Sequence, residues 1–101
     1  MDPPQQRNIL IIDDNLEDRV AIRRYLLKDW RIRFTIHEAS NGRQGLSQCQ
    51  SLQLDCVLLD YNLPDMTGTA FLDHLRIKPD QPFLPVVVLT GVAAKRSRCS
   101  R

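Results

Sequence analysis

Short apolar runs and alternating segments recur along the chain at spacings that predict strands separated by helices. Residues 56–59 form an uninterrupted apolar run, the pattern of a parallel strand that is covered on both faces. Ile32, Phe34 and Ile36 alternate with polar residues, as in a half-buried strand. The predicted strands are residues 8–12, 31–39, 56–59 and 85–90.

Three helices are predicted between these strands, at residues 16–28, 43–50 and 69–76. Asn15 can cap the first helix, in which Leu16, Val20 and Leu27 share one face, as an amphipathic helix with a buried face requires. The residues predicted to face inward from the other two are Leu46, Cys49, Phe71, Leu72 and Leu75. Alternating strands and helices predict right-handed crossovers and an α/β fold with one open parallel sheet.

Oxygen-bearing side chains stand where the predicted strands end. Asp13 and Asp14 follow the first strand, Asp60 follows the third, and Thr90 ends the fourth. In an open parallel sheet the functional site lies outside the carboxyl ends of the strands. We therefore expect these four side chains to share one site.

Three aspartates in a partly dry crevice would repel one another and raise the pKa of at least one carboxyl group, unless a cation neutralises them. Magnesium favours oxygen ligands and commonly sits between one or two carboxylates and a phosphate. Asp60 can then act as a nucleophile toward phosphorus. The pattern predicts a magnesium-dependent phosphoryl-transfer site.

Each of these residues also has a structural alternative. Aspartates after strands are common helix caps and turn formers. Thr90 can simply end a strand, and Pro64 with Gly68 can simply shape a loop. Their joint placement at predicted strand ends favours a functional site over these alternatives.

Three motifs resemble those of response-regulator receiver domains. They are IIDDN at residues 11–15, VLLDYNLPDMTG at 57–68 and VVVLTG at 86–91, within a resemblance that covers residues 8–91. The resemblance implies a flavodoxin-like fold, in which flanking helices cover an open parallel sheet of strand order 2-1-3-4-5. Residues 1–7 are then a polar N-terminal lead.

The same resemblance implies a role for each site residue. Asp60 is the phosphoacceptor, and Mg2+ is held by Asp13, Asp14, Asp60 and the backbone carbonyl of Asn62. Thr90 matches the hydroxyl residue that bonds the phosphoryl oxygen and moves on activation. The implied partner is a histidine kinase or a histidine phosphotransfer protein. The protein is then a regulator, not an enzyme, with at most slow autophosphorylation and autodephosphorylation.

Composition narrows the partners further. The chain has 14 Lys and Arg against 12 Asp and Glu, a formal net charge of +2 that does not indicate nucleic acid as a partner. No apolar run approaches the roughly 18 to 20 residues that span a bilayer, and residues 1–7 do not form a signal peptide. We expect a cytoplasmic protein with no membrane partner. The cysteines lack CxxC spacing, which argues against a zinc site or a disulfide framework.

The sequence departs from the family pattern after Thr90. A receiver domain continues through a fourth helix, a fifth strand that ends in a lysine, and a fifth helix, and Lys95 lies too close to Thr90 to be that lysine. We therefore expect an incomplete domain that lacks the fifth strand and the fifth helix. The exposed fourth strand would then favour aggregation or a homodimer.

Residues 92–101 form a basic tail without the apolar periodicity of a receiver helix. A change of reading frame at Gly91 accounts for this composition, because one permitted codon choice, shifted by two nucleotides, encodes a segment similar to the missing helix. The coding DNA would test this hypothesis.

Two other functions remain open. A binding-only receiver would contact its kinase without productive phosphorylation, and an aspartate-nucleophile phosphohydrolase would use Asp60, although such enzymes usually have a second aspartate where this chain has Asn62. His37 and His74 lack a carboxylate at a telling spacing, so we assign them to packing or to the surface. Trp30 is predicted to pack at the end of the first helix.

Overall fold

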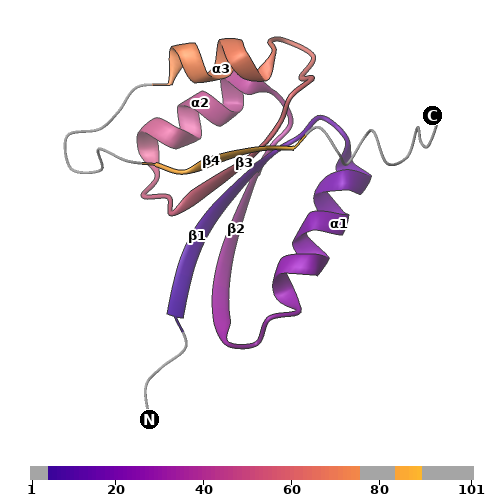
Figure 1. The fold of residues 1–101 in the computed structure, drawn as a ribbon, viewed down its shortest axis with the longest axis vertical. Coiled ribbons are helices and arrows are strands. Elements are labelled where there is room, and N and C mark those ends of the chain that lie inside the picture. The colour runs from indigo at the N-terminus through magenta and orange to yellow at the C-terminus, as the bar shows by residue number, and fades with distance from the viewer. Residues whose placement is uncertain (1–4, 76–83, 90–101) are drawn as a thin grey trace.

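A computed structural model of the chain describes residues 5–75 and 84–89. Strands and helices alternate along this part of the chain, as predicted (Figure 1). The strands are β1 (Gln5–Ile12), β2 (Ile32–Ala39), β3 (Cys56–Asp60) and β4 (Val86–Leu89). The helices are α1 (Leu16–Leu27), α2 (Gly42–Ser51) and α3 (Gly68–His74).

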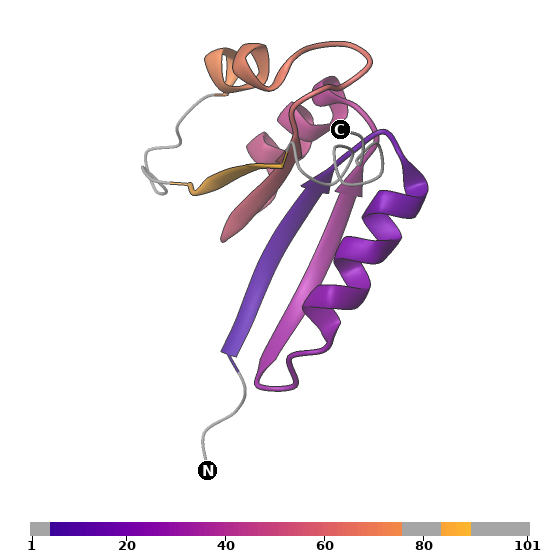
Figure 2. The ribbon, with the colours of Figure 1, turned by 45° about the vertical axis from the view of Figure 1, so that its right-hand side comes forward.

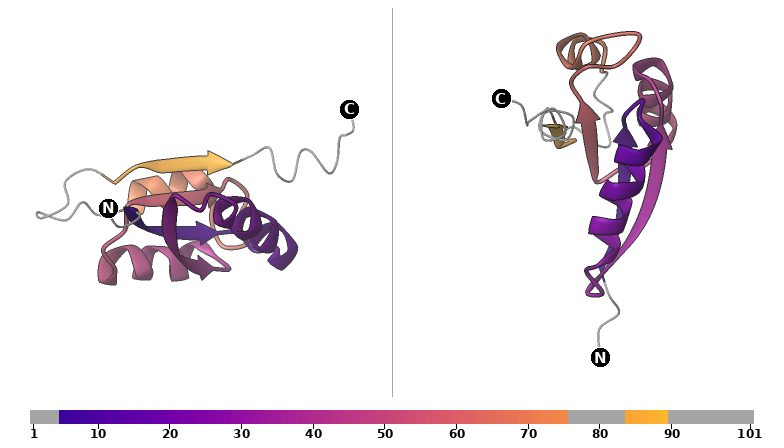
Figure 3. Two further views of the ribbon diagram at one scale, coloured as in Figure 1. Left: turned by 90° about the horizontal axis from the view of Figure 1, so that it is seen from below. Right: turned by 90° about the vertical axis from the view of Figure 1, so that its right-hand side faces the viewer.

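The described strands form one parallel sheet of order β2-β1-β3-β4, which confirms the predicted open α/β architecture. β1 pairs with β2 over its full length, in a register that sets Ile12 against Ala39, whereas only Ile9–Ile12 pair with β3. The amino-terminal parts of β1 and β2 therefore extend beyond the rest of the sheet (Figures 2 and 3). The central strands β1 and β3 end side by side.

The main hydrophobic core lies between the sheet and helices α2 and α3, whereas α1 lies on the other side of the sheet (Figure 1). Its buried members are Leu10, Ile12, Ala39, Cys49, Leu54, Val57, Leu59, Leu63 and Phe71. The predicted inward positions of Cys49 and Phe71 are confirmed, and Leu46 and Leu75 are partly buried against the same core. Leu72 was predicted to face inward as well, but it is 43% exposed.

Side-chain caps determine where the helices begin. Asn15 caps α1 as predicted, because its side-chain oxygen accepts hydrogen bonds from the N–H groups of Glu17 and Asp18 at 2.8 and 3.2 Å. Asn41 caps α2 and Thr67 caps α3 in the same way. Each cap satisfies backbone donors that have no partner inside the first turn of a helix.

The face of α1 that we predicted to be buried lies at the surface. The exposed fractions are 61% for Leu16, 36% for Val20 and 55% for Leu27. The helix instead turns Arg19 and Arg23 toward β2, where both side chains pair with the carboxylate of Glu38. Asp18, Ile22 and Leu26 are the buried or half-buried residues on that same side of α1, so its Leu16 face points away from the sheet.

Two further predictions differ from the structure. β1 begins at Gln5, not at residue 8, because residues 5–7 pair with β2 in register. These residues are polar and exposed, so the apolar pattern did not reveal this part of the strand. Trp30 does not pack at the end of α1 but is 85% exposed, next to the turn that the Asp29–Arg31 ion pair stabilises. None of the described helices combines the length and the apolar character that a membrane-spanning helix needs.

Candidate metal site

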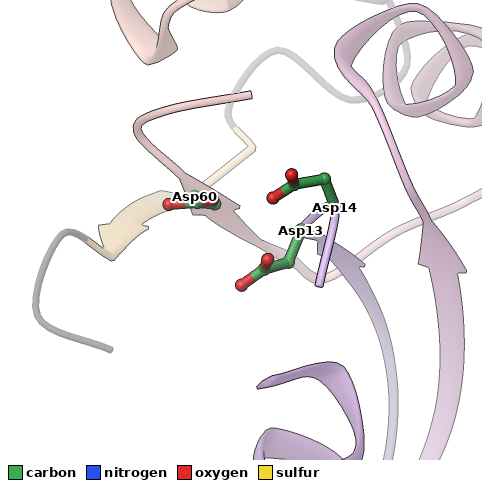
Figure 4. Close-up of side chains that lie close together, drawn as sticks. All are labelled: Asp13, Asp14 and Asp60. Carbon is green, nitrogen blue, oxygen red and sulfur yellow. The ribbon is translucent and has the colours of Figure 1, made fainter. Parts of the chain in front are cut away.

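Three aspartates meet at the carboxyl ends of the two central strands (Figure 4). Asp13 and Asp14 follow β1, and Asp60 is the last residue of β3, which pairs directly with β1. One carboxylate oxygen from each residue lies within 4.8 Å of the other two. Asp13 is buried, Asp60 is half-buried and Asp14 is exposed, so the cluster opens to solvent on one side.

The carboxyl group of Asp13 has a raised pKa. The pKa of Asp13 rises from 3.8 to about 6, mainly because the carboxyl group is buried. The hydrogen bond that it accepts from the Asn15 N–H opposes this rise. The charges of Asp60, Asp18 and Asp14 raise the pKa of Asp13 further. Ionisation of Asp13 is therefore less favourable than that of an ordinary aspartate, as expected for a buried carboxylate beside other acids.

This donor set fits a hard divalent cation. Magnesium prefers oxygen ligands, keeps several waters and is usually bound by only one or two carboxylates together with phosphate oxygens. A cation here would offset the repulsion that raises the pKa of Asp13. The three aspartates can hold such an ion, and their partial exposure leaves room for water or a second ligand.

The loop that follows Asp60 closes on itself. The Gly68 N–H donates to the carbonyl oxygen of Tyr61 at 2.7 Å, and Asn62 forms an isolated antiparallel bridge with Thr67. A Cβ atom on Gly68 would lie 3.3 Å from the Tyr61 Cα and 3.0 Å from its Cδ1, so this close approach favours glycine. The closed loop keeps the Asn62 main chain beside the end of β3, where its N–H donates to Asp60 Oδ1 at 3.4 Å.

Arg19 and Glu38 brace the turn between β1 and α1, and neither was among the predicted site residues. Arg19 Nε donates to Glu38 Oε1 at 2.9 Å, and Arg19 Nη1 donates to the main-chain carbonyl of Asp13 at 2.5 Å. The hydrogen bond from Arg23 lowers the pKa of Glu38 most; burial opposes this shift, and the hydrogen bond from Arg19 adds to it. Glu38 therefore remains a carboxylate that holds both arginines.

One sequence signal could have drawn attention to Arg19. A cation near the start of a helix opposes the positive end of the helix dipole and is unfavourable there without an acidic partner. Arg19 lies in the first turns of α1, so its position implied a partner elsewhere in the chain. The sequence offers many acids, however, and only the fold selects Glu38.

The remaining predicted residues lie in different surroundings. Pro64 is exposed within the loop after Asp60, and His74 is exposed in the last turn of α3. His37 is half-buried in β2, next to Glu38. Thr90 and the basic tail at residues 92–101 fall outside the described residues.

Comparison with known proteins places the chain in a family. The family model for the response regulator receiver domain matches residues 9–99. The chain is 31% identical over 85 residues to the cyclic di-GMP phosphodiesterase response regulator RpfG of Xanthomonas campestris. It is 38% identical over 78 residues to the nitrate/nitrite response regulator protein NarL of Escherichia coli. These matches cover 84% and 77% of this chain but only 22% of RpfG and 36% of NarL.

A solved structure extends the likeness. The chain resembles a response regulator protein from Burkholderia pseudomallei with a TM-score of 0.68 and 26% sequence identity, over 84% of this chain and 47% of that chain. The structure of that protein contains a phosphorylated aspartic acid, a calcium ion and citrate.

An open parallel sheet with an acidic cluster at the ends of its central strands, together with these matches, defines a receiver module of two-component systems. The chain belongs to the response regulator receiver domain family. Receiver domains are regulatory domains rather than classic enzymes, and the match to the phosphodiesterase RpfG covers only the receiver part of that protein.

Proposed function

We propose that the chain accepts a phosphoryl group on Asp60, with Mg2+ held by the carboxylates of Asp13, Asp14 and Asp60 and by the main-chain carbonyl of Asn62. The observation that carries this proposal is the approach of the three carboxylates to within 4.8 Å at the ends of adjacent strands. The phosphorylated aspartic acid and calcium ion in the Burkholderia pseudomallei relative support it.

In this proposal each residue has a separate task. A carboxylate oxygen of Asp60 attacks phosphorus, and the bond from phosphorus to the donor imidazole nitrogen breaks, so that the histidine leaves with the electron pair and takes up a proton. Asp13 and Asp14 orient the metal, which would supply positive charge against the phosphoryl oxygens. The closed loop from Tyr61 to Gly68 keeps Asn62 in position. Thr90, outside the described residues, is the proposed hydroxyl partner of the phosphoryl group.

The donor we propose is a histidine kinase or a histidine phosphotransfer protein. Membership of the receiver family supports this class of partner. A homodimer through β4 remains a second proposal about partners, supported by the exposure of Val87 and Val88 at 45% and 38% on the outer strand of the described sheet. Sedimentation of the purified chain over a range of concentrations would test the dimer.

The phosphoacceptor proposal can be tested with beryllofluoride, a mimic of the phosphoryl group. Binding should be measured by isothermal titration calorimetry with and without Mg2+, beside Asp60→Asn as the matched control. Calorimetry is preferable to intrinsic fluorescence, because Trp30 is exposed near the start of β2, at the end of the sheet opposite Asp60.

We expect binding that requires Mg2+ and is lost in Asp60→Asn. A folded wild-type protein that binds neither Mg2+ nor beryllofluoride would instead indicate a binding-only receiver. Sustained turnover of a small phosphate ester that Asp60→Asn abolishes would indicate a phosphohydrolase.

A further inference from the structure

Asp65 lies at the tip of the loop that follows Asp60, and its side chain contacts a different element. Its two carboxylate oxygens accept hydrogen bonds from the backbone N–H groups of Gly42 and Arg43, at 2.8 and 2.9 Å. These groups are the first two donors of α2, which have no partner within the helix. One carboxylate thus joins the loop that follows Asp60 to a helix that begins more than twenty residues earlier in the chain.

The start of α2 already has its own cap. Asn41 Oδ1 accepts a hydrogen bond from the Gln44 N–H at 2.8 Å, so α2 has a local cap that does not involve the loop. The bonds from Gly42 and Arg43 to Asp65 therefore connect two elements, in addition to any stabilisation of the helix. A negative charge is also favourable at this end of the helix dipole.

Apolar contacts hold the same loop in place. Leu63 is buried in the main core, and the side chain of Met66 lies so close to Gly42 that a Cβ atom there would be 2.5 Å from its Cγ and Sδ. Asp65 stands between these two anchors. The loop is thus attached to the core by Leu63, to the surface of Gly42 by Met66, and to the amino end of α2 by Asp65.

The charge state of Asp65 agrees with this role. Desolvation raises the pKa of its carboxyl group, but the hydrogen bonds from the backbone N–H groups of Gly42, Arg43 and Asp65 itself, together with the charge of Arg43, outweigh desolvation, so the pKa lies below its usual value. Asp65 is therefore ionised at neutral pH and accepts both hydrogen bonds as a carboxylate, which makes them stronger than bonds between neutral groups.

From this geometry we infer that Asp65 is a positioning residue, which clamps the loop to α2 and so holds Asn62 and Asp60 in the arrangement that binds the metal. The inference rests on the proposed function, since it concerns the same metal site. Asp65 does not lie in the carboxylate cluster itself, so its effect on the metal is exerted through the loop.

The test compares Mg2+ affinity with stability in four single variants: Asp65→Asn, Asp65→Ala, Asp55→Asn and Asn41→Ala. Asp65→Asn removes the charge and one of the two acceptor oxygens. Asp55→Asn is the matched control, because Asp55 Oδ2 also accepts a backbone N–H, from Asn8 at 2.7 Å, but just before β3, at the end opposite the site. Asn41→Ala removes the local cap of α2 and leaves the loop attached.

Affinity should be measured by calorimetric titration with MgCl2, and stability by urea unfolding without metal. Loss of groups that orient metal ligands typically weakens metal binding by about tenfold or more, so we expect Asp65→Asn to bind Mg2+ about tenfold more weakly. Asp55→Asn and Asn41→Ala should lower stability and leave Mg2+ affinity within about twofold of wild type. Asp65→Ala should weaken binding at least as much as Asp65→Asn.

Other outcomes separate this inference from the proposed function. If wild type and Asp65→Asn bind Mg2+ with the same affinity, the inference is overturned and the proposed function is unaffected. Equal weakening in Asp65→Asn and Asn41→Ala also overturns it, because Asp65 would then act only by stabilising α2. Wild type that does not bind Mg2+ contradicts the proposed function, and the inference fails with it.

Discussion

Arg19 Nη1 donates a hydrogen bond to the main-chain carbonyl oxygen of Asp13, at 2.5 Å. The same guanidinium group pairs with Glu38 on β2, and its side chain is only 14% exposed. One arginine thus ties the backbone of the buried aspartate of the acidic cluster to a neighbouring strand. Both the stability of the domain and the geometry of the aspartate cluster should depend on it.

Replacing Arg19 by alanine should lower stability and metal affinity together. The change removes two hydrogen bonds that involve a charged group, each of which contributes about 1.5 to 3 kcal/mol, so we expect a loss of at least about 3 kcal/mol. Urea unfolding and calorimetric titration with MgCl2 would measure the two effects. Arg24→Ala is the control, since Arg24 is an exposed arginine of the same helix. Equal behaviour of the two variants would contradict the bracing role of Arg19.

Glu38→Gln should change the acid limb of the stability profile. The pKa of Glu38 lies below its usual value of 4.5 in the folded protein, mainly because Arg23 hydrogen-bonds to its carboxylate. Its ionisation therefore stabilises the fold above about pH 4.5, and this contribution is lost as the pH falls through the lowered folded-state pKa. At pH 7 we expect the free energy of unfolding of wild type to be about 1 to 2 kcal/mol larger than that of Glu38→Gln.

The difference in unfolding free energy between wild type and Glu38→Gln should become smaller as the pH falls below about 4.5. Urea unfolding of both proteins at several pH values between 7 and 3 would measure it. A gap that stays constant over this range would show that Glu38 stabilises the protein by some means other than its charge.

Asp13→Asn should stabilise the metal-free protein at neutral pH. The pKa of Asp13 is raised from 3.8 to about 6 in the folded protein, whereas that of Glu38 is lowered, so the two residues affect stability in opposite directions. The contribution of Asp13 to folding stability is fully present below pH 3.8 and is lost as the pH rises through about 6. A shift of this size corresponds to at most about 3 kcal/mol. Asparagine keeps an oxygen that can accept the Asn15 N–H, and it carries no charge to repel Asp60.

The same variant gives a metal-dependent readout. Without metal, the stability advantage of Asp13→Asn over wild type should grow between pH 4 and pH 7. Saturating MgCl2 should stabilise wild type and reverse the order at pH 7, because binding to the folded state alone adds stability. An advantage that does not depend on pH, or that Mg2+ leaves unchanged, would count against a strained acidic cluster at this position.

Gly45→Ala should be more harmful than Gly42→Ala, although both glycines lie in α2 and alanine favours helices. A Cβ atom on Gly45 would be 2.4 Å from Ile12 Cδ1 and 3.2 Å from Phe71 Cε2, and both side chains are fully buried. Overpacking of this kind costs about 1 to 3 kcal/mol. On Gly42 the three atoms nearest to the Cβ all belong to the flexible side chain of Met66, which can adopt another rotamer at lower cost.

Unfolding in urea would compare the two glycine variants, and the midpoint should fall clearly further for Gly45→Ala. The reverse order would mean that Met66 is held rigidly over Gly42. That result would strengthen the case that the loop after Asp60 is firmly attached to α2.

The apolar pattern alone determined most of the fold. Cys56–Leu59 forms a central parallel strand because only a strand covered by other chain segments needs such continuous apolar residues. The similar run Val86–Leu89 also forms a parallel strand, but it is the outer strand of the described sheet, and Val87 and Val88 are exposed. Asn15 identified the start of α1, since capping is a local interaction between neighbours in sequence. The aspartates at the strand ends were also accessible from sequence, because parallel strands bring their carboxyl ends to one edge. The origin proposed for residues 92–101 and the role of Thr90 stay predictions.

Only the tertiary structure decided which residues meet across the chain. Leu16 and Val20 were assigned to a buried face from their spacing, but spacing fixes which residues share a face and not which way that face turns. In the structure Arg19 and Arg23 face Glu38, and Ile22 and Leu26 are half-buried on the same side of the helix. The contact of Asp65 with the start of α2 was likewise invisible in the sequence, since any acid in the chain could have met those donors. Local patterns thus determined the elements and the acidic site, whereas long-range hydrogen bonds, which depend on the packed arrangement of strands and helices, determined how that site is held.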